Sequence, residues 1–254
     1  MKGPAAAVTD VGRVRSHNED TYLLRPEMGL YLVADGMGGH QAGDIASAMV
    51  RLSITNFFDA TRAEPWSAEF TEPEDEGLAV PARRLAAAIR KANKDVYTVA
   101  SSNMRHYGMG STVVTAFLPP STRIMHVAHV GDSRCYRIRE RSLELLTRDH
   151  SLVNEALAID PEMTKEELAR LPQNIITRAL GMEPTVDVDV ASVEVERGDT
   201  YLLCSDGLSG LISNEEILEA IQLIEDPVEV CDLLVELANE AGGLDNITAL
   251  VLRI

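Results

Sequence analysis

Short runs rich in Val, Ile, Leu and Tyr recur along this chain and constrain its fold more than any other feature. They cover residues 30–34, 111–118, 123–130, 134–139, 186–195, 200–204 and 247–254, and most of them have the length of a β-strand. The runs on either side of Pro119 and Pro120 are separated by a short turn, which indicates a hairpin and hence antiparallel pairing. The chain is therefore expected to contain antiparallel β-sheet.

Apolar residues at helical spacing occur in two separate groups, at 45–57 and 85–99 and then at 213–224 and 230–241. A capping box at Ser213 and Glu216 opens the third helix, and Gly242 follows the fourth. Helices that do not alternate with the strands favour an α+β fold over a doubly wound parallel one. In the first two helices the positions expected to face a core are Ile45, Met49, Leu52, Phe57, Leu85, Ile89, Ala92, Val96 and Val99.

The composition is that of a globular protein with a strong negative charge. With 254 residues and 45% hydrophobic content, the chain can bury an ordinary core, and we expect 1–254 to form a single domain. The loop-like stretch at 64–81 is interpreted as an excursion within that domain. Asp and Glu outnumber Lys and Arg by 40 to 23, and the resulting net charge of −17 argues against nucleic acid as a partner.

Nothing in the sequence indicates secretion or membrane insertion. The N-terminal segment lacks the apolar stretch of a signal peptide, and no run approaches the roughly 18–20 apolar residues that span a bilayer. Cys135, Cys204 and Cys231 are far apart and odd in number, so they indicate neither a disulfide framework nor a zinc site. We expect a cytoplasmic protein that does not bind membranes.

Four of the apolar runs end at, or start from, an aspartate in a turn of small residues. These residues are Asp35 in LYLVADGMGG, Asp132 in HVAHVGDSR, Asp206 in YLLCSDGL and Asp245 in GGLDNITALVL. Any one of them has an ordinary structural explanation, because Asp and Gly are favoured in turns. Four together are a stronger signal, because strand ends in one sheet system can converge on a single point.

Converging carboxylates require cations. Two carboxylates about 4 Å apart repel by roughly 4 kcal/mol at an effective dielectric constant near 20. Oxygen-only ligands suit Mg²⁺ or Mn²⁺ better than Zn²⁺, and no His/Cys set with zinc spacing is present. A further acidic pair, Glu19 and Asp20, follows Arg15 in RSHNEDTY; it could be a solvated turn, or a metal-binding pair beside a guanidinium that binds phosphate.

The motifs GRVRSHNED, LVADGMGGH, GSTVV, HVGDSR, LTRDHS, ITRALG, LLCSDGL and DNIT occur in this order. Together they resemble the bacterial branch of the metal-dependent type 2C (PPM family) serine/threonine protein phosphatases, over about residues 8–251. The resemblance implies a four-layer α-β-β-α sandwich, in which two antiparallel β-sheets pack face to face and helices flank them. It also implies a metal cleft at one edge.

The resemblance further implies a role for each matching residue. Asp35 would bridge two Mg²⁺ or Mn²⁺ ions, the carbonyl of Gly36 would ligate one of them, and Asp206 and Asp245 would complete the other. Glu19 and Asp20 would ligate metal directly or through water, and Asp132 would bind a third, weaker ion together with Asp206. Arg15 would bind the substrate phosphate, and Asn246 would orient a ligand from outside the coordination shell.

The expected reaction is direct attack of a metal-activated water on phosphoserine or phosphothreonine. No cysteine lies in a C-x5-R loop, and Asp35 is not followed by the D-x-D-x-T pattern of aspartyl-phosphate enzymes, so no phosphoenzyme is expected. His40 in DGMGGH is the candidate general acid, with a surface loop histidine as the alternative. Residues 151–172 match a flap, in which Thr164 and Glu167 form a capping box and predict a small helix.

The expected partners are phosphorylated proteins and a cognate serine/threonine protein kinase. The sequence does not determine the oligomeric state, and a monomer is taken as the working expectation.

Two other hypotheses for the function remain. A metal-dependent nuclease would also cluster carboxylates but is opposed by the charge of −17. A degenerate phosphatase serving as a scaffold is opposed by the presence of Asp35, Asp206 and Asp245 together.

Overall fold

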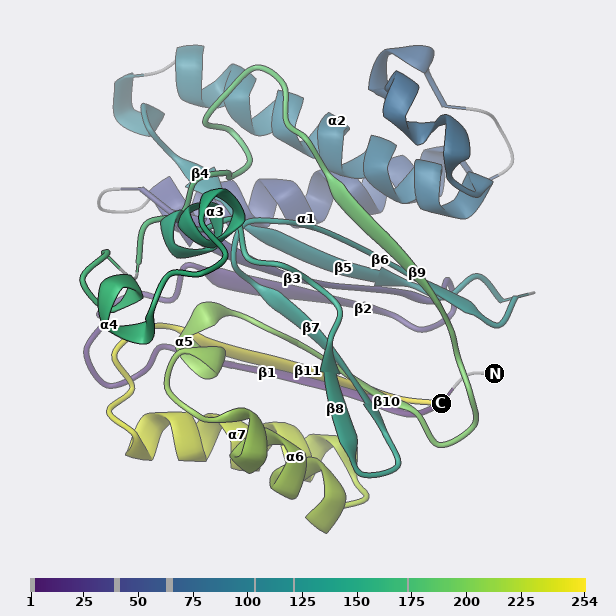
Figure 1. Cartoon of the computed structure of the whole chain (residues 1–254). Coiled ribbons are helices and arrows are strands. Elements are labelled where there is room, and N and C mark those ends of the chain that lie inside the picture. Colours follow the sequence, from purple (N-terminus) through teal and green to yellow (C-terminus); the bar gives the residue numbers. More distant parts are fainter. Residues whose placement is uncertain (1–2, 39–41, 63–65, 103, 121, 173) are drawn as a thin grey trace.

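Two antiparallel β-sheets packed face to face form the centre of the protein, and helices cover both outer faces (Figure 1). The structure, a computed structural model, describes residues 3–38, 42–62, 66–102, 104–120, 122–172 and 174–254. The predicted α+β, four-layer α-β-β-α sandwich is therefore confirmed. Among the described residues, no helix combines the length and apolar character needed to cross a bilayer.

Each sheet is built from strands that are distant in the sequence. One sheet has the order β1 (Ala5–Asp10), β11 (Ile247–Arg253), β10 (Thr200–Cys204), β7 (Arg134–Arg139) and β8 (Ser142–Leu145). The other has the order β2 (Asp20–Arg25), β3 (Leu30–Met37), β5 (Val113–Phe117), β6 (Ile124–Val130) and β9 (Asp189–Glu194), while β4 (Gly110–Ser111) pairs with the end of β3. The predicted β5–β6 hairpin around Pro119 and Pro120 is present.

Strand β3 illustrates why the central runs are apolar on both faces. Tyr31 and Val33 pack between the two sheets, while Leu30, Leu32 and Ala34 pack beneath the helices on the outer face. Successive side chains of a strand point to opposite faces, so a strand covered on both sides has no polar alternation. The continuous apolar sequence of β3 is the consequence.

The outer layers are α1 (Ala42–Ala60) and α2 (Val80–Ser102) on one side, and α6 (Asn214–Leu223) and α7 (Pro227–Glu240) on the other (Figure 1). The capping box of Ser213 and Glu216 that opens α6 is confirmed. The predicted buried face of α1 is wrong in part, because Ile45 and Leu52 are 36% and 51% exposed. Small residues such as Ala46 and Ser47 pack against the sheet in their place, since α1 lies close to β3.

The stretch at 64–81 is more ordered than the loop we expected. Its described part contains two 3₁₀ turns, η1 (Ala68–Phe70) and η2 (Pro73–Gly77), and α2 already begins at Val80. Asp75 is buried and accepts two hydrogen bonds from Arg90 of α2, at 2.6 and 3.0 Å. The segment is thus anchored to α2 by an ion pair whose side chains are only 4% and 11% exposed.

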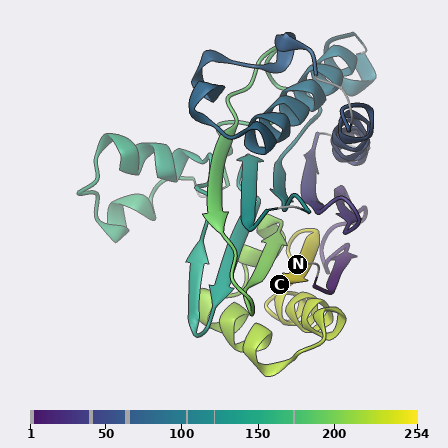
Figure 2. The ribbon, with the colours of Figure 1, turned by 90° about the vertical axis from the view of Figure 1, so that its right-hand side faces the viewer.

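A helical excursion leaves the sandwich between β8 and β9. It carries α3 (Leu152–Ile159) and α4 (Lys165–Leu168), neither of which has a buried residue, and Figure 2 shows it projecting from the body. The capping box of Thr164 and Glu167 predicted the helix α4, and this is confirmed. The longer helix α3, capped by Ser151, was not predicted. We call residues 151–172 the flap.

The Asp75–Arg90 pair yields the first prediction. Replacing Asp75 by Ala leaves the guanidinium of Arg90 without its buried partner, so the free energy of unfolding should fall by about 3 kcal/mol. The matched control is Glu69→Ala, which removes an exposed partner of Lys94 and should change stability by less than about 1 kcal/mol. Urea denaturation of the three proteins measures both effects, and equal losses in the two variants would contradict the assignment.

Candidate metal-binding active site

The aspartates predicted from the strand ends all lie at one edge of the sandwich. In antiparallel sheets the end of one strand lies beside the start of its neighbour, and Asp20 at the start of β2 is paired directly with Asp35 of β3. The other sheet contributes Asp206, two residues after the end of β10, and Asp245, shortly before β11. The charges of Asp20, Asp206, Asp132 and Asp245 all act on Asp35, so the sheets bring these carboxylates together.

Asp20 is the most enclosed member of the cluster. Its Oδ2 accepts hydrogen bonds from Ser205 Oγ at 2.7 Å and from Thr248 Oγ1 at 2.6 Å, while its Oδ1 has no hydrogen-bond partner within the described chain. Burial raises the pKa of Asp20 to about 7, although the two hydroxyl groups oppose the shift. An ionised Asp20 therefore costs the metal-free folded protein on the order of 4 kcal/mol at neutral pH.

Asp35 and Gly36 end the long strand β3. The backbone N–H of Asp35 donates to Thr112 Oγ1 at 3.1 Å, and its carbonyl accepts from Thr112 N at 2.8 Å, so the turn is fixed from both sides. Burial, followed by the charges of the neighbouring aspartates, raises the pKa of Asp35 well above its usual value. Gly36 has no room for a side chain, because a Cβ there would lie 1.9 Å from the carbonyl oxygen of Gly43.

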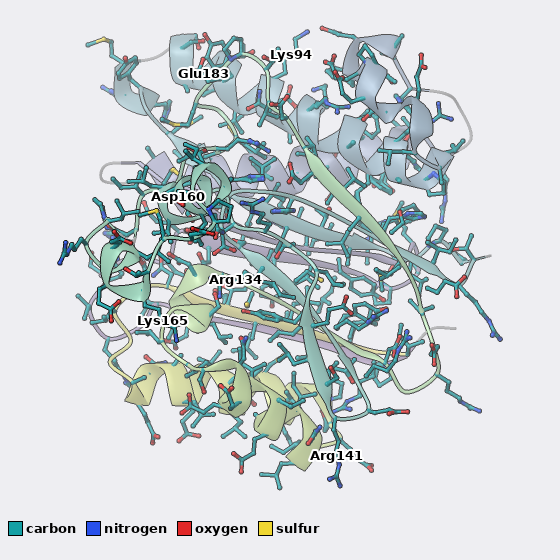
Figure 3. The ribbon with its side chains drawn as sticks, viewed as in Figure 1. Lys94, Arg134, Arg141, Asp160, Lys165 and Glu183 are labelled. Atoms are coloured by element: carbon teal, nitrogen blue, oxygen red, sulfur yellow. The ribbon has the colours of Figure 1, made fainter. Side chains whose placement is uncertain are left out.

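Asp132 and Asp206 are two further members of the cluster. Burial, and after it the charge of Asp206, raises the pKa of Asp132 to about 7. Burial also raises the pKa of Asp206, with the charge of Asp245 as the next cause, while a hydrogen bond with the Asp35 carboxyl group lowers it. Figure 3 labels Arg134, which follows Asp132 by two residues, near α5 (Asp206–Ser209), and Asp160 and Lys165 on the flap.

Arg15 points at a predicted metal ligand. Its Nη2 donates to Asp245 Oδ2 at 2.7 Å, with side chains 53% and 35% exposed, and this hydrogen bond raises the pKa of Arg15. Asn246 braces the preceding loop, because its Oδ1 accepts from Glu19 N at 2.8 Å and its Nδ2 donates to the carbonyls of Val11 and His17. Asn246 thus fixes the position of Glu19 relative to Asp245, its neighbour in the sequence.

Glu19 sits at the N-terminus of α1. Its carboxylate accepts a hydrogen bond from the backbone N–H of Gly43, while burial raises the pKa of Glu19 overall. The helix N-terminus carries partial positive charge, which favours a carboxylate in this place. One face of the Glu19 carboxylate is therefore already engaged by the protein.

One direct observation indicates that the carboxylates suit divalent cations. Asp20 Oδ1, Asp132 Oδ1 and Asp206 Oδ1 are buried and have no hydrogen-bond partner among the residues that the structure describes. Buried polar atoms are nearly always satisfied, and unpaired carboxylate oxygens from several directions suit a hard cation with oxygen ligands. His40, the candidate general acid, lies outside the described residues.

Sequence reasoning missed the polar residues that hold the ligands. Ser205 and Thr248 clamp Asp20, and Thr112 hydrogen-bonds to both Asp35 and Ser133 Oγ, the latter at 2.7 Å. Ser133, Ser205 and Thr248 stand inside the motifs that contain the aspartates, and Thr112 stands in the GSTVV motif, so membership of these motifs was the available signal. Their roles become visible only in the three-dimensional structure, because residues such as Ser205 and Asp20 are 185 positions apart in the sequence.

Comparison with known proteins places the chain in a family. A family model for protein phosphatase 2C matches residues 8–247. The chain is 39% identical to the serine/threonine phosphatase Stp of Listeria monocytogenes over 249 residues, covering 96% of this chain and 93% of the relative. A crystal structure of the Mycobacterium tuberculosis serine/threonine phosphatase PstP/Ppp superposes with a TM-score of 0.82 and 35% identity, covering 99% of this chain and 98% of that one.

A second solved structure, the catalytic domain of the phosphatase PstP in complex with two manganese ions, has a TM-score of 0.80 and 35% identity over 98% of this chain and 97% of that one. A sandwich of two antiparallel sheets with clustered carboxylates at one edge defines a class of metal-binding domains. The family match and these identities are more specific: the chain belongs to the protein phosphatase 2C family.

The pKa of Asp20 predicts a pH-dependent stability. Because its folded pKa is raised, the folded protein holds the proton more tightly than the unfolded chain, and stability is lost as pH rises from about 4 to about 7. In EDTA, Asp20→Asn should therefore gain stability relative to the wild type over this range, by roughly 2–4 kcal/mol at pH 7.5. With saturating Mn²⁺ the order should reverse. A pH-independent difference in denaturant unfolding would contradict the shift.

Proposed function

We propose that this protein removes phosphate from phosphoserine and phosphothreonine in phosphorylated proteins, using two Mg²⁺ or Mn²⁺ ions held at the carboxylate edge. One observation carries the proposal. Carboxylates from separate strand ends converge with buried, unpartnered oxygens, in a chain that belongs to the protein phosphatase 2C family. The relatives named serine/threonine phosphatases support the choice of substrate.

The proposed ligand set follows the position of each group. Asp35 lies at the centre of the cluster and would hold both ions, with the carbonyl of Gly36 on one of them. Asp206 and Asp245 would hold the other ion, and Asp132 with Asp206 would hold a third, weaker one. Asp20 and Glu19 are partly engaged by hydroxyl and backbone donors, which favours binding through water.

When bound, such ions lower the pKa of a bridging water toward about 7 and stabilise the oxygens of an in-line displacement. The chain itself orients the substrate. Arg15 is already held at the site by Asp245, and its guanidinium fork matches two phosphate oxygens once cations neutralise that carboxylate. His40 remains our proposed donor of a proton to the leaving group.

The cysteines support a route without a covalent intermediate. Cys135, Cys204 and Cys231 are all buried, and burial raises the pKa of Cys204 and Cys231 to about 12. Cys135 is shifted in the same direction for the same reason. A buried thiol that stays protonated is not a nucleophile at neutral pH.

The cellular setting is also a proposal. A phosphatase of this kind would act in the cytoplasm as a monomer and reverse the action of a cognate serine/threonine protein kinase. The net charge of −17 supports protein over nucleic acid as substrate. The flap at 151–172 projects from the body of the protein and would contribute to the choice of substrate.

Replacing Asp35 tests the core of the proposal. Asp35→Asn should lower the release of phosphate from a phosphothreonine peptide with Mn²⁺ by at least about 10²–10³-fold, because the central ligand is lost. The control is Asp226→Asn, an exposed helix cap at which Asn also caps, and it should keep full activity. Unchanged turnover in Asp35→Asn, or EDTA-resistant activity in the wild type, would refute the proposal.

Arg15 gives a separate test of substrate binding. Arg15→Ala should lower kcat/KM for the phosphopeptide by roughly 10- to 100-fold, the effect of losing a charged hydrogen bond to phosphate. Arg13→Ala changes a neighbouring exposed arginine on the same loop and serves as the matched control. If both variants lose the same amount, general loop charge explains the result and Arg15 has no special role.

A further inference from the structure

A second cluster of ionisable groups contains His129, which precedes Asp132 by three residues. Ligand-type atoms of His129, His150 and Asp189 come within 4.8 Å of one another, and the two imidazole rings stack at a centroid distance of 4.7 Å. The residues come from β6, from the segment before the flap and from β9. The proposed ligands of the catalytic ions do not include any of them.

All three side chains of this cluster already take part in hydrogen bonds. Nδ1 of His150 accepts from the backbone N–H of Gly131 at 3.0 Å, while its Nε2 lies 3.0 Å from Arg178 Nη1 and 3.4 Å from Asp189 Oδ1. Arg178 Nη1 donates to the same Asp189 oxygen at 2.8 Å. A guanidinium thus already neutralises the carboxylate, and the cluster is a hydrogen-bonded junction.

The junction fixes the turn that carries Asp132. Besides the bond to its ring, His150 donates its backbone N–H to the carbonyl of Gly131 at 3.0 Å, so both polar groups of Gly131 are bonded to His150. Gly131 adopts φ +104°, and a Cβ there would lie 2.7 Å from Thr112 Cβ, so the turn admits no side chain. Asp132 follows directly, with one buried oxygen unpartnered.

The same residue closes the base of the flap. The carbonyl of His150 accepts from Thr177 N at 2.9 Å, and Leu152 N donates to the carbonyl of Ile175 at 3.0 Å. Ser151 and Ile176 form an antiparallel bridge between these two bonds. The two ends of the flap are thus tied together at His150, which is only 8% exposed.

We propose that His150 is a positioning residue that fixes the Gly131–Asp132 turn and thereby couples the weak third cation to the base of the flap. This inference rests on the proposed function only in taking Asp132 as a ligand of that cation. Coupling of this kind is reciprocal, so cation binding should also protect the flap base from opening.

The test is a Mn²⁺ titration of the whole protein, followed by isothermal calorimetry and Mn²⁺ electron paramagnetic resonance. His150→Leu removes the ring acceptor and should weaken the weakest class of Mn²⁺ sites by roughly 3- to 10-fold, the effect of one lost hydrogen bond. His150→Asn places an amide oxygen near the position of Nδ1 and should restore much of the affinity. Asp132→Asn should abolish the weak class.

The matched control is His126→Leu. His126 is another buried histidine of β6, and its Nδ1 pairs with Ser192 Oγ at 2.8 Å, away from the carboxylates. It should leave all classes of Mn²⁺ sites unchanged. Because Asp189 is 48% exposed, Asp189→Ala provides a mild second variant should His150→Leu fail to fold, and it should weaken the same class by roughly 2- to 5-fold.

Hydrogen exchange provides the second readout. Mn²⁺ at concentrations that fill the weak class should protect the amides of Leu152 and Thr177 in the wild type but not in His150→Leu. Wild-type affinity in both His150→Leu and Asp189→Ala, or the same loss in His150→Asn as in His150→Leu, would overturn the inference. Failure of the proposed function would appear differently, as a wild-type protein that binds Mn²⁺ as expected but releases no phosphate from the peptide.

Discussion

Mutual repulsion among buried carboxylates is the interaction on which the rest of this structure depends. Two such groups about 4 Å apart repel by roughly 4 kcal/mol at an effective dielectric constant near 20, and at least four aspartates act on one another at this edge. Burial, and after it the same repulsion, raises the pKa values of Asp35 and Asp132. Without cations the folded chain relieves it by holding protons. Divalent ions would relieve it with the carboxylates ionised, as the proposed chemistry needs.

The sandwich is what keeps the carboxylates together against this repulsion. Asp35, Asp132, Asp206 and Asp245 stand at or near the ends of strands that are buried on both faces, so they cannot retreat without disturbing the core. Backbone amides and hydroxyls fix them further, as Ser205 and Thr248 do for Asp20. Preorganised charged groups in a fixed, poorly solvated place are the main means by which enzymes stabilise a transition state.

The sequence alone was sufficient for the architecture and for the convergence of the aspartates. Strand-length apolar runs ending in Asp are a local signal, and the family resemblance carried by the ordered motifs implied the sandwich. The predicted face of α1 was wrong at Ile45 and Leu52 because residues close to a sheet must be small, and apolar periodicity counts Leu52 but overlooks Ala46 and Ser47. The anchoring of 64–81 by Asp75 was missed because an acidic stretch resembles a solvated loop, and its partner Arg90 is fifteen residues away.

The roles of Ser205, Thr248 and His150 could not be predicted at all, since each depends on a contact between residues far apart in the chain. The central claim, that these carboxylates trap divalent cations, is tested most directly by anomalous diffraction from crystals grown with Mn²⁺. The account predicts two strong anomalous peaks, both within bonding distance of Asp35, one also bonded to Asp206 and Asp245. Peaks elsewhere, or an Asp35 carboxylate that contacts no ion, would contradict it.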